Sequence, residues 1–149
     1  MSGMSAIELL AAKDAITTLM ARRVYALDTQ DWDTYAACHA PDHVSHALAG
    51  GPHVGRDAMM QGTRQALEGV RSIHHVHSPE IMILSPEEAR GRWAMEDRLY
   101  WMQGDEEHWL HGWGYYHDGY GVRDGQWLFT SREVTRQRVE HSPGSRRAP

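Results

Sequence analysis

The stretch Ala89–Met102, ARGRWAMEDRLYWM, decides the fold class of this chain. Large apolar side chains alternate along it with charged ones, and a period of two predicts a long β-strand with one face against a core. The residues expected on the core face are Trp93, Met95, Asp97, Leu99 and Trp101. The residues expected on the opposite face are Arg92, Glu96, Arg98 and Tyr100.

Three further segments in the second half of the chain have the same β texture, at about Ile73–Leu84, Glu107–Val122 and Gln126–Arg138. Short turn signals containing Gly, Asp or Pro separate them. Long strands on such short connections pair with their neighbours in antiparallel fashion. We therefore expect a curved, mostly antiparallel sheet.

The first half of the chain is mainly helical. Apolar residues three and four positions apart predict a helix over Ile7–Leu27, and shorter helices are expected over Trp32–His39 and Asp57–Gly69. The segment His43–Gly55, rich in Gly, His and Pro, predicts a short strand or hairpin. Three helices followed by four long strands predict an α+β domain in which the helices cover one face of the sheet.

Length and composition predict one domain over residues 1–140 and a disordered tail over 141–149, because the chain has only 149 residues and 41% of them are hydrophobic. The apolar runs are far shorter than the ~20 residues that span a bilayer, and the chain does not begin with a basic and apolar leader. We expect no membrane partner and a cytoplasmic location. A net charge of −5 without a basic patch excludes nucleic acid as a partner.

Polar residues in apolar patterns are the first candidates for function. Asp97 falls in the apolar row of its strand, where a carboxylate needs a partner or an altered pKa, as catalytic and structural carboxylates both do. Arg23 lies in the middle of the apolar face of the first helix, and Asp28 lies at the edge of that face near the helix end. His74 is on the strand face opposite to its neighbour His75. Because ligands must converge, we expect the histidines of this strand to form no metal site.

Four short stretches carry a resemblance to a known family, namely Tyr25–Asp28, Ile73–His75, Gly91–Asp97 and Asp124–Trp127. In this order and spacing they resemble the SnoaL-like branch of the nuclear transport factor 2-like superfamily. The chain is most similar there to cofactor-free lyases, which are bile-acid 7α-dehydratase, scytalone dehydratase and hexachlorocyclohexane dehydrochlorinase. The resemblance implies a cone-shaped barrel of a bent sheet wrapped around helices, with a deep apolar pocket inside.

The resemblance also implies roles for individual residues. His74 stands at the position of the catalytic base and Asp28 at that of the aspartate that orients it, while Asp97 matches a further aspartate of the bile-acid enzymes. Arg23 replaces a tyrosine common at its position, and it or Tyr116 would stabilise developing negative charge. The side chains expected to contact the substrate are those of Arg23, Tyr116, Trp93 and Leu99.

These observations together lead us to expect a cofactor-free lyase or isomerase, most simply a dehydratase, for a hydrophobic cyclic or aromatic small molecule. A polyketide-cyclase-like enzyme and a non-catalytic small-molecule binding domain are the alternatives. We expect no metal and no organic cofactor. On the third long strand, Trp109, Trp113 and Tyr115 lie on the face opposite to Gly112, Gly114 and Tyr116, which the resemblance places inside the pocket. This aromatic row on the outer face predicts a homo-oligomer, either a trimer or a dimer.

Overall fold

The computed structural model of this chain describes residues 3–146. Its helices are α1 (Ala6–Thr29), α2 (Trp32–Ala37) and α3 (Arg56–Ala66). Its strands are β1 (His39–Ser45), β2 (His53–Val54), β3 (Val70–Ser85), β4 (Glu88–Gln103), β5 (Glu106–Arg123) and β6 (Gln126–His141). The expected α+β class and the four long strands are confirmed.

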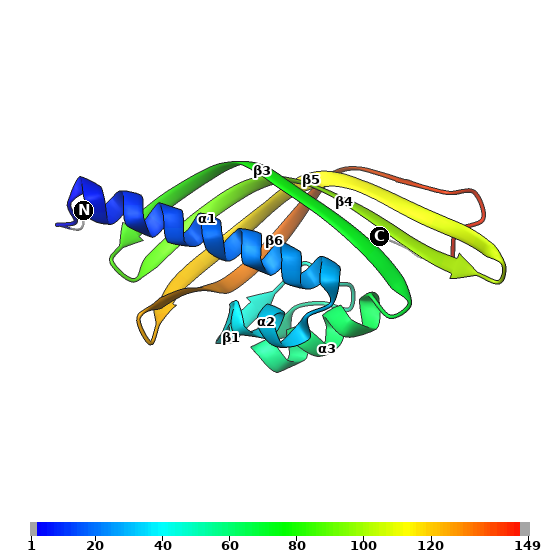
Figure 1. The fold of residues 1–149 in the computed structure, drawn as a ribbon, viewed down its shortest axis with the longest axis horizontal. Helices are drawn as coiled ribbons and strands as arrows, with labels where there is room; N and C mark the ends of the chain where they lie inside the picture. Colours follow the sequence, from blue (N-terminus) through cyan, green and yellow to red (C-terminus); the bar gives the residue numbers. More distant parts are fainter. Residues whose placement is uncertain (1–2, 147–149) are drawn as a thin grey trace.

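The six strands form one curved sheet in the order β2-β1-β6-β5-β4-β3. Only β1 and β6 run parallel, and the other neighbouring strands are antiparallel. Figure 1 shows the long strands arching over α1, with α2 and α3 gathered beneath the C-terminal half of that helix. The sheet does not close, because β2 and β3 are its two edges. A concave face covered by helices is the geometry needed for an internal cavity.

Helix α1 is fixed at both ends. Ser5 and Glu8 form a capping box at its start, in which the Ser5 hydroxyl accepts from the Glu8 backbone and the Glu8 carboxylate accepts from the Ser5 backbone. Gln30 ends the helix in the left-handed conformation, and its side-chain amide donates to the carbonyl oxygens of Leu67 and Val70. These bonds attach the end of α1 to the beginning of β3. They hold Asp28, in the last turn, over that strand.

The core forms two clusters along the concave face. The first packs the middle of α1 on the sheet and includes Ile16, Leu19, Met20, Trp93, Tyr120 and Phe129. The second joins the end of α1 to α2, α3 and the sheet, and includes Leu27, Tyr35, Met59, Leu67, Trp101 and Leu110. Arg23 lies on the same helix face as these apolar residues and is only 6% exposed.

Several boundaries differ from those expected from the sequence, and the third helix, for example, ends at Ala66 and not at Gly69. The second helix ends at Ala37, and His39 belongs to β1, because the Phe129 N–H donates to the Cys38 carbonyl and His39 pairs with Phe129 across the sheet. The tail is ordered at its beginning, since His141 ends β6 and buried Ser142 bonds through its hydroxyl to His108. Residues 147–149 of the expected tail lie outside the described residues.

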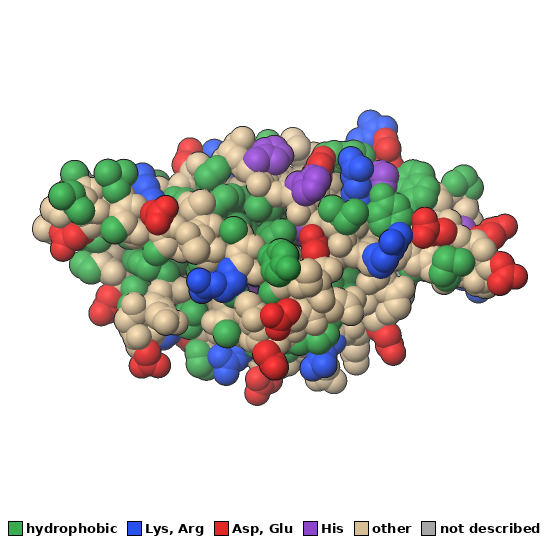
Figure 2. Space-filling view, viewed as in Figure 1, with side chains coloured by type: hydrophobic (Ala, Val, Ile, Leu, Met, Phe, Trp, Pro, Cys, Tyr) green, Lys and Arg blue, Asp and Glu red, His purple; other side chains and the backbone are tan. Residues whose placement is uncertain are grey.

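The surface carries both signs of charge. Figure 2 shows Lys and Arg side chains interspersed with Asp and Glu side chains over the face seen in Figure 1. Among the helices of residues 3–146, none is long and apolar enough to cross a membrane.

Candidate active site

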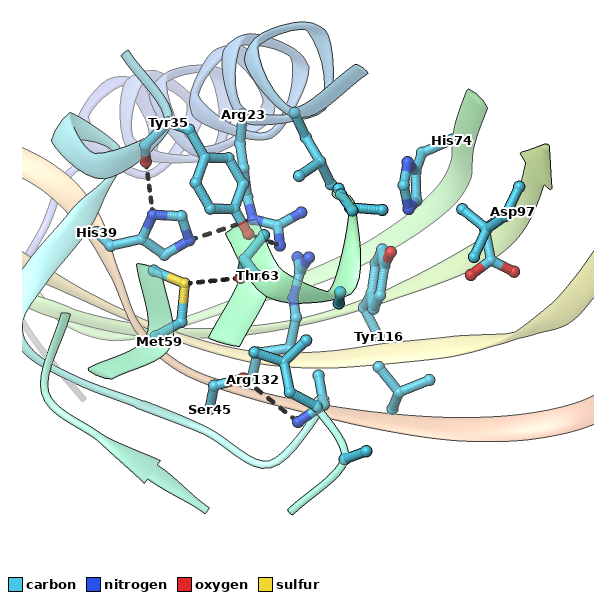
Figure 3. Close-up of a pocket in the computed structure, with 18 of the residues that line it drawn as sticks. Arg23, Tyr35, His39, Ser45, Met59, Thr63, His74, Asp97, Tyr116 and Arg132 are labelled. Atoms are coloured by element: carbon cyan, nitrogen blue, oxygen red, sulfur yellow. Dashed lines mark hydrogen bonds between the residues drawn. The ribbon is translucent and has the colours of Figure 1, made fainter. Parts of the chain in front are cut away.

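A cavity of about 370 Å³ lies between the concave face of the sheet and the helices. This volume is within the range of small-molecule sites. Its apolar wall includes Leu27, Met59, Leu67, Leu99, Trp101 and Leu110. Its polar side chains fall into two groups, which Figure 3 shows on either side of Tyr116. One group contains His74 and Asp97, and the other contains Arg23, Tyr35, His39 and Arg132.

His74 and Asp28 form a hydrogen-bonded pair between β3 and the end of α1. The His74 Nδ1 and the Asp28 Oδ1 are 2.7 Å apart, and the side chains are 9% and 21% exposed. The other carboxylate oxygen accepts from the His74 backbone N–H at 2.8 Å, and the Ser72 hydroxyl donates to Oδ1 at 2.8 Å. These donors fix the carboxylate, which in turn fixes the imidazole.

The Asp28 carboxylate stays ionised in this setting. Burial by itself would raise its pKa, but the hydrogen bond and the attraction of the His74 ring, with the His74 N–H and the Ser72 hydroxyl, lower the pKa below the ordinary value. The negative end of the α1 dipole disfavours a carboxylate here, so these donors are needed. An ionised Asp28 accepts a hydrogen bond from the N–H at Nδ1 of His74. In this tautomer the Nε2 of His74 carries no proton and can act as a base.

Asp97 lies opposite His74 on the neighbouring strand, since the two residues are register partners of β3 and β4. Its carboxylate makes two parallel hydrogen bonds with the Arg136 guanidinium of β6, at 2.7 and 2.8 Å. Gly112 belongs to β5, which lies between β4 and β6 in the sheet. A Cβ at Gly112 would collide with both Arg136 Nη1 and Asp97 Oδ1. The glycine therefore makes room for the ion pair.

The second polar group surrounds Arg23. Its Nη2 donates to the Tyr35 hydroxyl at 2.8 Å, and its Nε lies 3.2 Å from His39 Nε2. Burial, reinforced by the Arg23 charge, holds the pKa of His39 well below its ordinary value. Burial likewise lowers the pKa of His43 to about 4. Both imidazoles are therefore neutral at pH 7, beside a permanent cation.

Arg132 of β6 joins the same group. Its guanidinium makes two hydrogen bonds to Asp118, at 2.7 and 2.8 Å, and lies 3.7 Å from the centre of the Tyr116 ring. Tyr116 is buried, and this burial raises the pKa of its hydroxyl despite the nearby arginines. The phenol is therefore a neutral hydrogen-bond donor at pH 7.

Most of the expected site residues surround this cavity. His74, Asp97, Arg23, Tyr116 and Leu99 line it, and Asp28 lies directly behind His74. Trp93 is not among the residues that line this cavity. It faces inward as its strand position predicted, but it packs in the first core cluster and its indole N–H donates to the Tyr120 hydroxyl.

Four lining residues with basic side chains were not expected from the sequence. Arg132 and Arg136 are separated by Val134 on the inner face of β6, and this alternation was the available signal. His39 and His43 both belong to β1. They could not be recognised as lining residues because the sequence gives no clue to the parallel pairing of β1 with β6.

The part of the chain that the structure describes contains no group of three or more His, Cys, Asp or Glu side chains arranged to hold a metal ion. His74 is partly buried and faces the cavity, whereas His75 is exposed on the opposite face, as their strand positions predicted. Catalysis without a metal or an organic cofactor stays a prediction.

The chain is similar to a known protein family and to several solved structures. The profile of the SnoaL-like domain matches residues 8–133. A hexachlorocyclohexane dehydrochlorinase, LinA type 2, superimposes with a TM-score of 0.82 at 18% identity, covering 97% of this chain and 98% of that one. A putative scytalone dehydratase from Novosphingobium aromaticivorans has a TM-score of 0.81 at 24% identity, with 91% of each chain covered. A protein of unknown function from Mycobacterium tuberculosis has a TM-score of 0.74 at 25% identity, covering 91% of this chain and 78% of that one.

Proposed function

The chain belongs to the SnoaL-like domain family, and we propose that it is a cofactor-independent lyase that eliminates water from a hydrophobic cyclic or aromatic small molecule. The observation that carries this proposal is the His74–Asp28 pair at the wall of a largely apolar cavity. A binding pocket has no need of an imidazole held in one tautomer by a half-buried carboxylate. A general base has that need.

In the proposed reaction, Nε2 of His74 takes a proton from a carbon next to an electron-withdrawing group of the substrate. The electron pair of that C–H bond becomes the new C=C bond as the C–O bond to the leaving hydroxyl breaks. The imidazolium then returns the proton to the departing oxygen, which leaves as water. Asp28 stabilises the imidazolium between these steps, because its carboxylate already accepts from Nδ1 at 2.7 Å.

Asp97 and Arg136 would position the leaving hydroxyl. Both oxygens of the Asp97 carboxylate accept from the guanidinium, and their remaining lone pairs can accept from a substrate hydroxyl. Asp97 is thus better suited to hold a substrate hydroxyl than to donate a proton. Its register position opposite His74 puts that hydroxyl beside the base.

The named neighbours agree with this chemistry. A dehydratase removes water and a dehydrochlorinase removes hydrogen chloride, and both reactions take a proton from one atom and a leaving group from another. Their identities to this chain are 18% and 24%, which establishes the shared fold alone. The proposal therefore rests on the geometry of the pair, and the neighbours make an elimination the reaction to test first.

The test compares two histidines of the same strand. Wild-type protein, His74→Gln and His75→Gln are assayed with a panel of cyclic and aromatic β-hydroxy ketones and β-hydroxy thioesters, and the conjugated alkene is measured by its ultraviolet absorbance. The same ketones without the hydroxyl are incubated in D₂O, and exchange of the proton next to the carbonyl is followed by NMR. We expect His74→Gln to lose both activities by at least about 10³-fold.

His75→Gln is the matched control, because His75 is also paired with a carboxylate but lies on the solvated face. It should keep wild-type rates within about twofold. Exchange without elimination would point instead to an isomerase or a cyclase that uses the same base. If neither reaction occurs although the ligands bind, or if His74→Gln keeps wild-type turnover, the chain is a binding domain or uses another base, and the proposal is wrong.

A further inference from the structure

Two buried arginines lie together on the far side of Tyr116 from His74. Arg23 is 6% exposed and Arg132 is 2% exposed. Their guanidinium carbons lie 5.9 and 3.7 Å from the centre of the Tyr116 ring, and 5.6 and 5.1 Å from that of Phe129. Figure 3 shows the two guanidinium groups pointing toward one another inside the cavity. Two like charges are thus held close together away from water.

Each of these guanidinium groups has one nitrogen without a partner. Nε and Nη2 of Arg132 donate to Asp118, while Nε and Nη2 of Arg23 engage His39 and Tyr35. Among the residues that the structure describes, neither the Nη1 of Arg23 nor that of Arg132 has a hydrogen-bond partner, although both atoms are buried. A buried, charged N–H group without an acceptor is costly, and such groups need an explanation.

The charges of this region do not balance. Asp118 compensates Arg132, but the partners of Arg23 are a phenol and an imidazole. That imidazole, His39, is neutral because its pKa is held well below its ordinary value by burial and by Arg23 itself. Asp97 is the only acid among the described lining residues, and it is already paired with Arg136. One positive charge, that of Arg23, remains inside the cavity.

We infer that the two Nη1 atoms form an anion-binding site, which holds one negatively charged group of an otherwise apolar ligand. A carboxylate fits, because each of its two oxygens can accept from one Nη1 and its single charge compensates Arg23. Tyr116 separates this site from His74 in Figure 3. The anionic group and the carbon that reacts are thus different parts of the ligand, joined by an apolar ring along the wall of Leu27, Leu99 and Leu110.

The identification of the ligand as a substrate rests on the proposed function. The binding of an anion at this site does not depend on that function. The inference names the substrate class as a hydrophobic organic acid. The probes are 2-naphthoate and its neutral analogue 2-naphthamide, which share a flat apolar ring system and differ in charge. Neither can undergo elimination, so their binding is measured without turnover. Failure of the lyase proposal therefore leaves this test unaffected.

Binding of both probes to the full chain is measured by isothermal titration calorimetry at pH 7. We expect wild-type protein to bind naphthoate at least about tenfold more tightly than naphthamide. Arg23→Met should abolish this preference, since it removes the uncompensated charge and keeps the length of the side chain. Arg23→Lys should retain part of the preference, because it keeps the charge but loses the fixed Nη1 geometry. Arg92→Met, which removes an exposed arginine paired with Glu80, is the control and should bind as wild type does.

Circular dichroism establishes whether the Arg23 variants fold. If the variants do not fold, the relative affinities of wild-type protein for naphthoate and naphthamide test the anion site. Equal affinities for acid and amide would overturn the inference. A sodium chloride titration separates a ligand carboxylate from a free ion. Displacement of naphthoate by millimolar chloride would assign the site to a small inorganic anion or a halide leaving group, and would overturn the organic-acid class.

Discussion

Two histidines that are adjacent in the sequence each pair with a carboxylate, on opposite faces of one sheet. On the concave face, His74 and Asp28 are 2.7 Å apart with 9% and 21% of their side chains exposed. On the convex face, His75 and Glu96 are 3.1 Å apart with 63% and 28% exposed. Both pairs consist of an imidazole and a carboxylate, but the first pair is largely shielded from solvent and the second is exposed to it.

The difference lies in how many donors hold the carboxylate. Asp28 accepts from the ring and the backbone N–H of His74 and from the Ser72 hydroxyl, on an element clamped to β3 by Gln30. Glu96 is a long side chain beside solvent, bonded to His75 and to the Trp113 indole. An exposed ion pair contributes little to stability or to orientation. The comparison teaches that a histidine–carboxylate pair becomes an oriented base only where burial and extra donors fix it.

The largest expected effect in this comparison is on turnover by the carboxylate variants. Asp28→Asn should lower kcat by about 10²–10⁴-fold, because an amide can donate to Nδ1 and so favour the tautomer whose Nε2 carries the proton. Glu96→Gln should leave kcat within about twofold of wild type. The measurement is steady-state turnover on whichever substrate the elimination panel identifies, with folding checked by circular dichroism. Equal effects of the two substitutions would remove the distinction between the faces.

The next effect is on stability as a function of pH, through the buried histidine His43. Its pKa falls from 6.5 to about 4 in the folded protein, with burial as the main cause and the charges of Arg23 and Arg132 acting in the same direction. Above pH 6.5 the imidazole is neutral in both states and contributes no pH dependence. Between pH 6.5 and 4 the unfolded chain binds a proton that the folded chain does not. Stability should therefore fall as the pH is lowered, by about 1.4 kcal/mol per pH unit and about 3 kcal/mol in all.

The measurement is urea unfolding of wild-type protein and His43→Gln at half-unit intervals from pH 7.5 to 4. The variant should lose the part of this slope that belongs to His43, and a comparable part should remain because the pKa of His39 is also lowered. A wild-type free energy of unfolding that stays flat between pH 6.5 and 4 would contradict the account. It would mean that both imidazoles reach water or an acceptor when they are protonated.

Local patterns were sufficient for the inner and outer faces of the long strands. Alternation put Asp97 inside and its neighbour Glu96 outside, and both predictions are confirmed by burial. The apolar face of α1 was likewise readable, including the inward Arg23. These features depend only on the period of a strand or a helix, which the sequence carries directly.

Pairings between distant segments were not readable. The register of β5 with β6 shifts between Trp113 and Gly114 and again between Gly119 and Tyr120, so alternation alone cannot tell which residues face each other. For this reason Arg136 was not recognised as the partner of Asp97. Trp93 faces inward as alternation predicted, but it packs in the first core cluster and not along the cavity, which a strand period alone cannot distinguish.

The smallest expected effect on catalysis belongs to the convex face. Trp109, Trp113 and Tyr115 are half-buried there, opposite the buried Gly112 and Tyr116, as the alternation predicted. We expect a second copy of the chain to cover this row. Multi-angle light scattering should give the mass of two or three chains for wild type. Trp113→Glu should shift the mass toward one chain while changing turnover far less than Asp28→Asn, because a carboxylate at the contact would be buried without a partner. Gln126→Glu adds the same charge at the exposed first residue of β6 and should leave the mass unchanged. If the wild-type protein is monomeric at micromolar concentration, the row is a solvated surface, and the convex face contributes neither assembly nor chemistry.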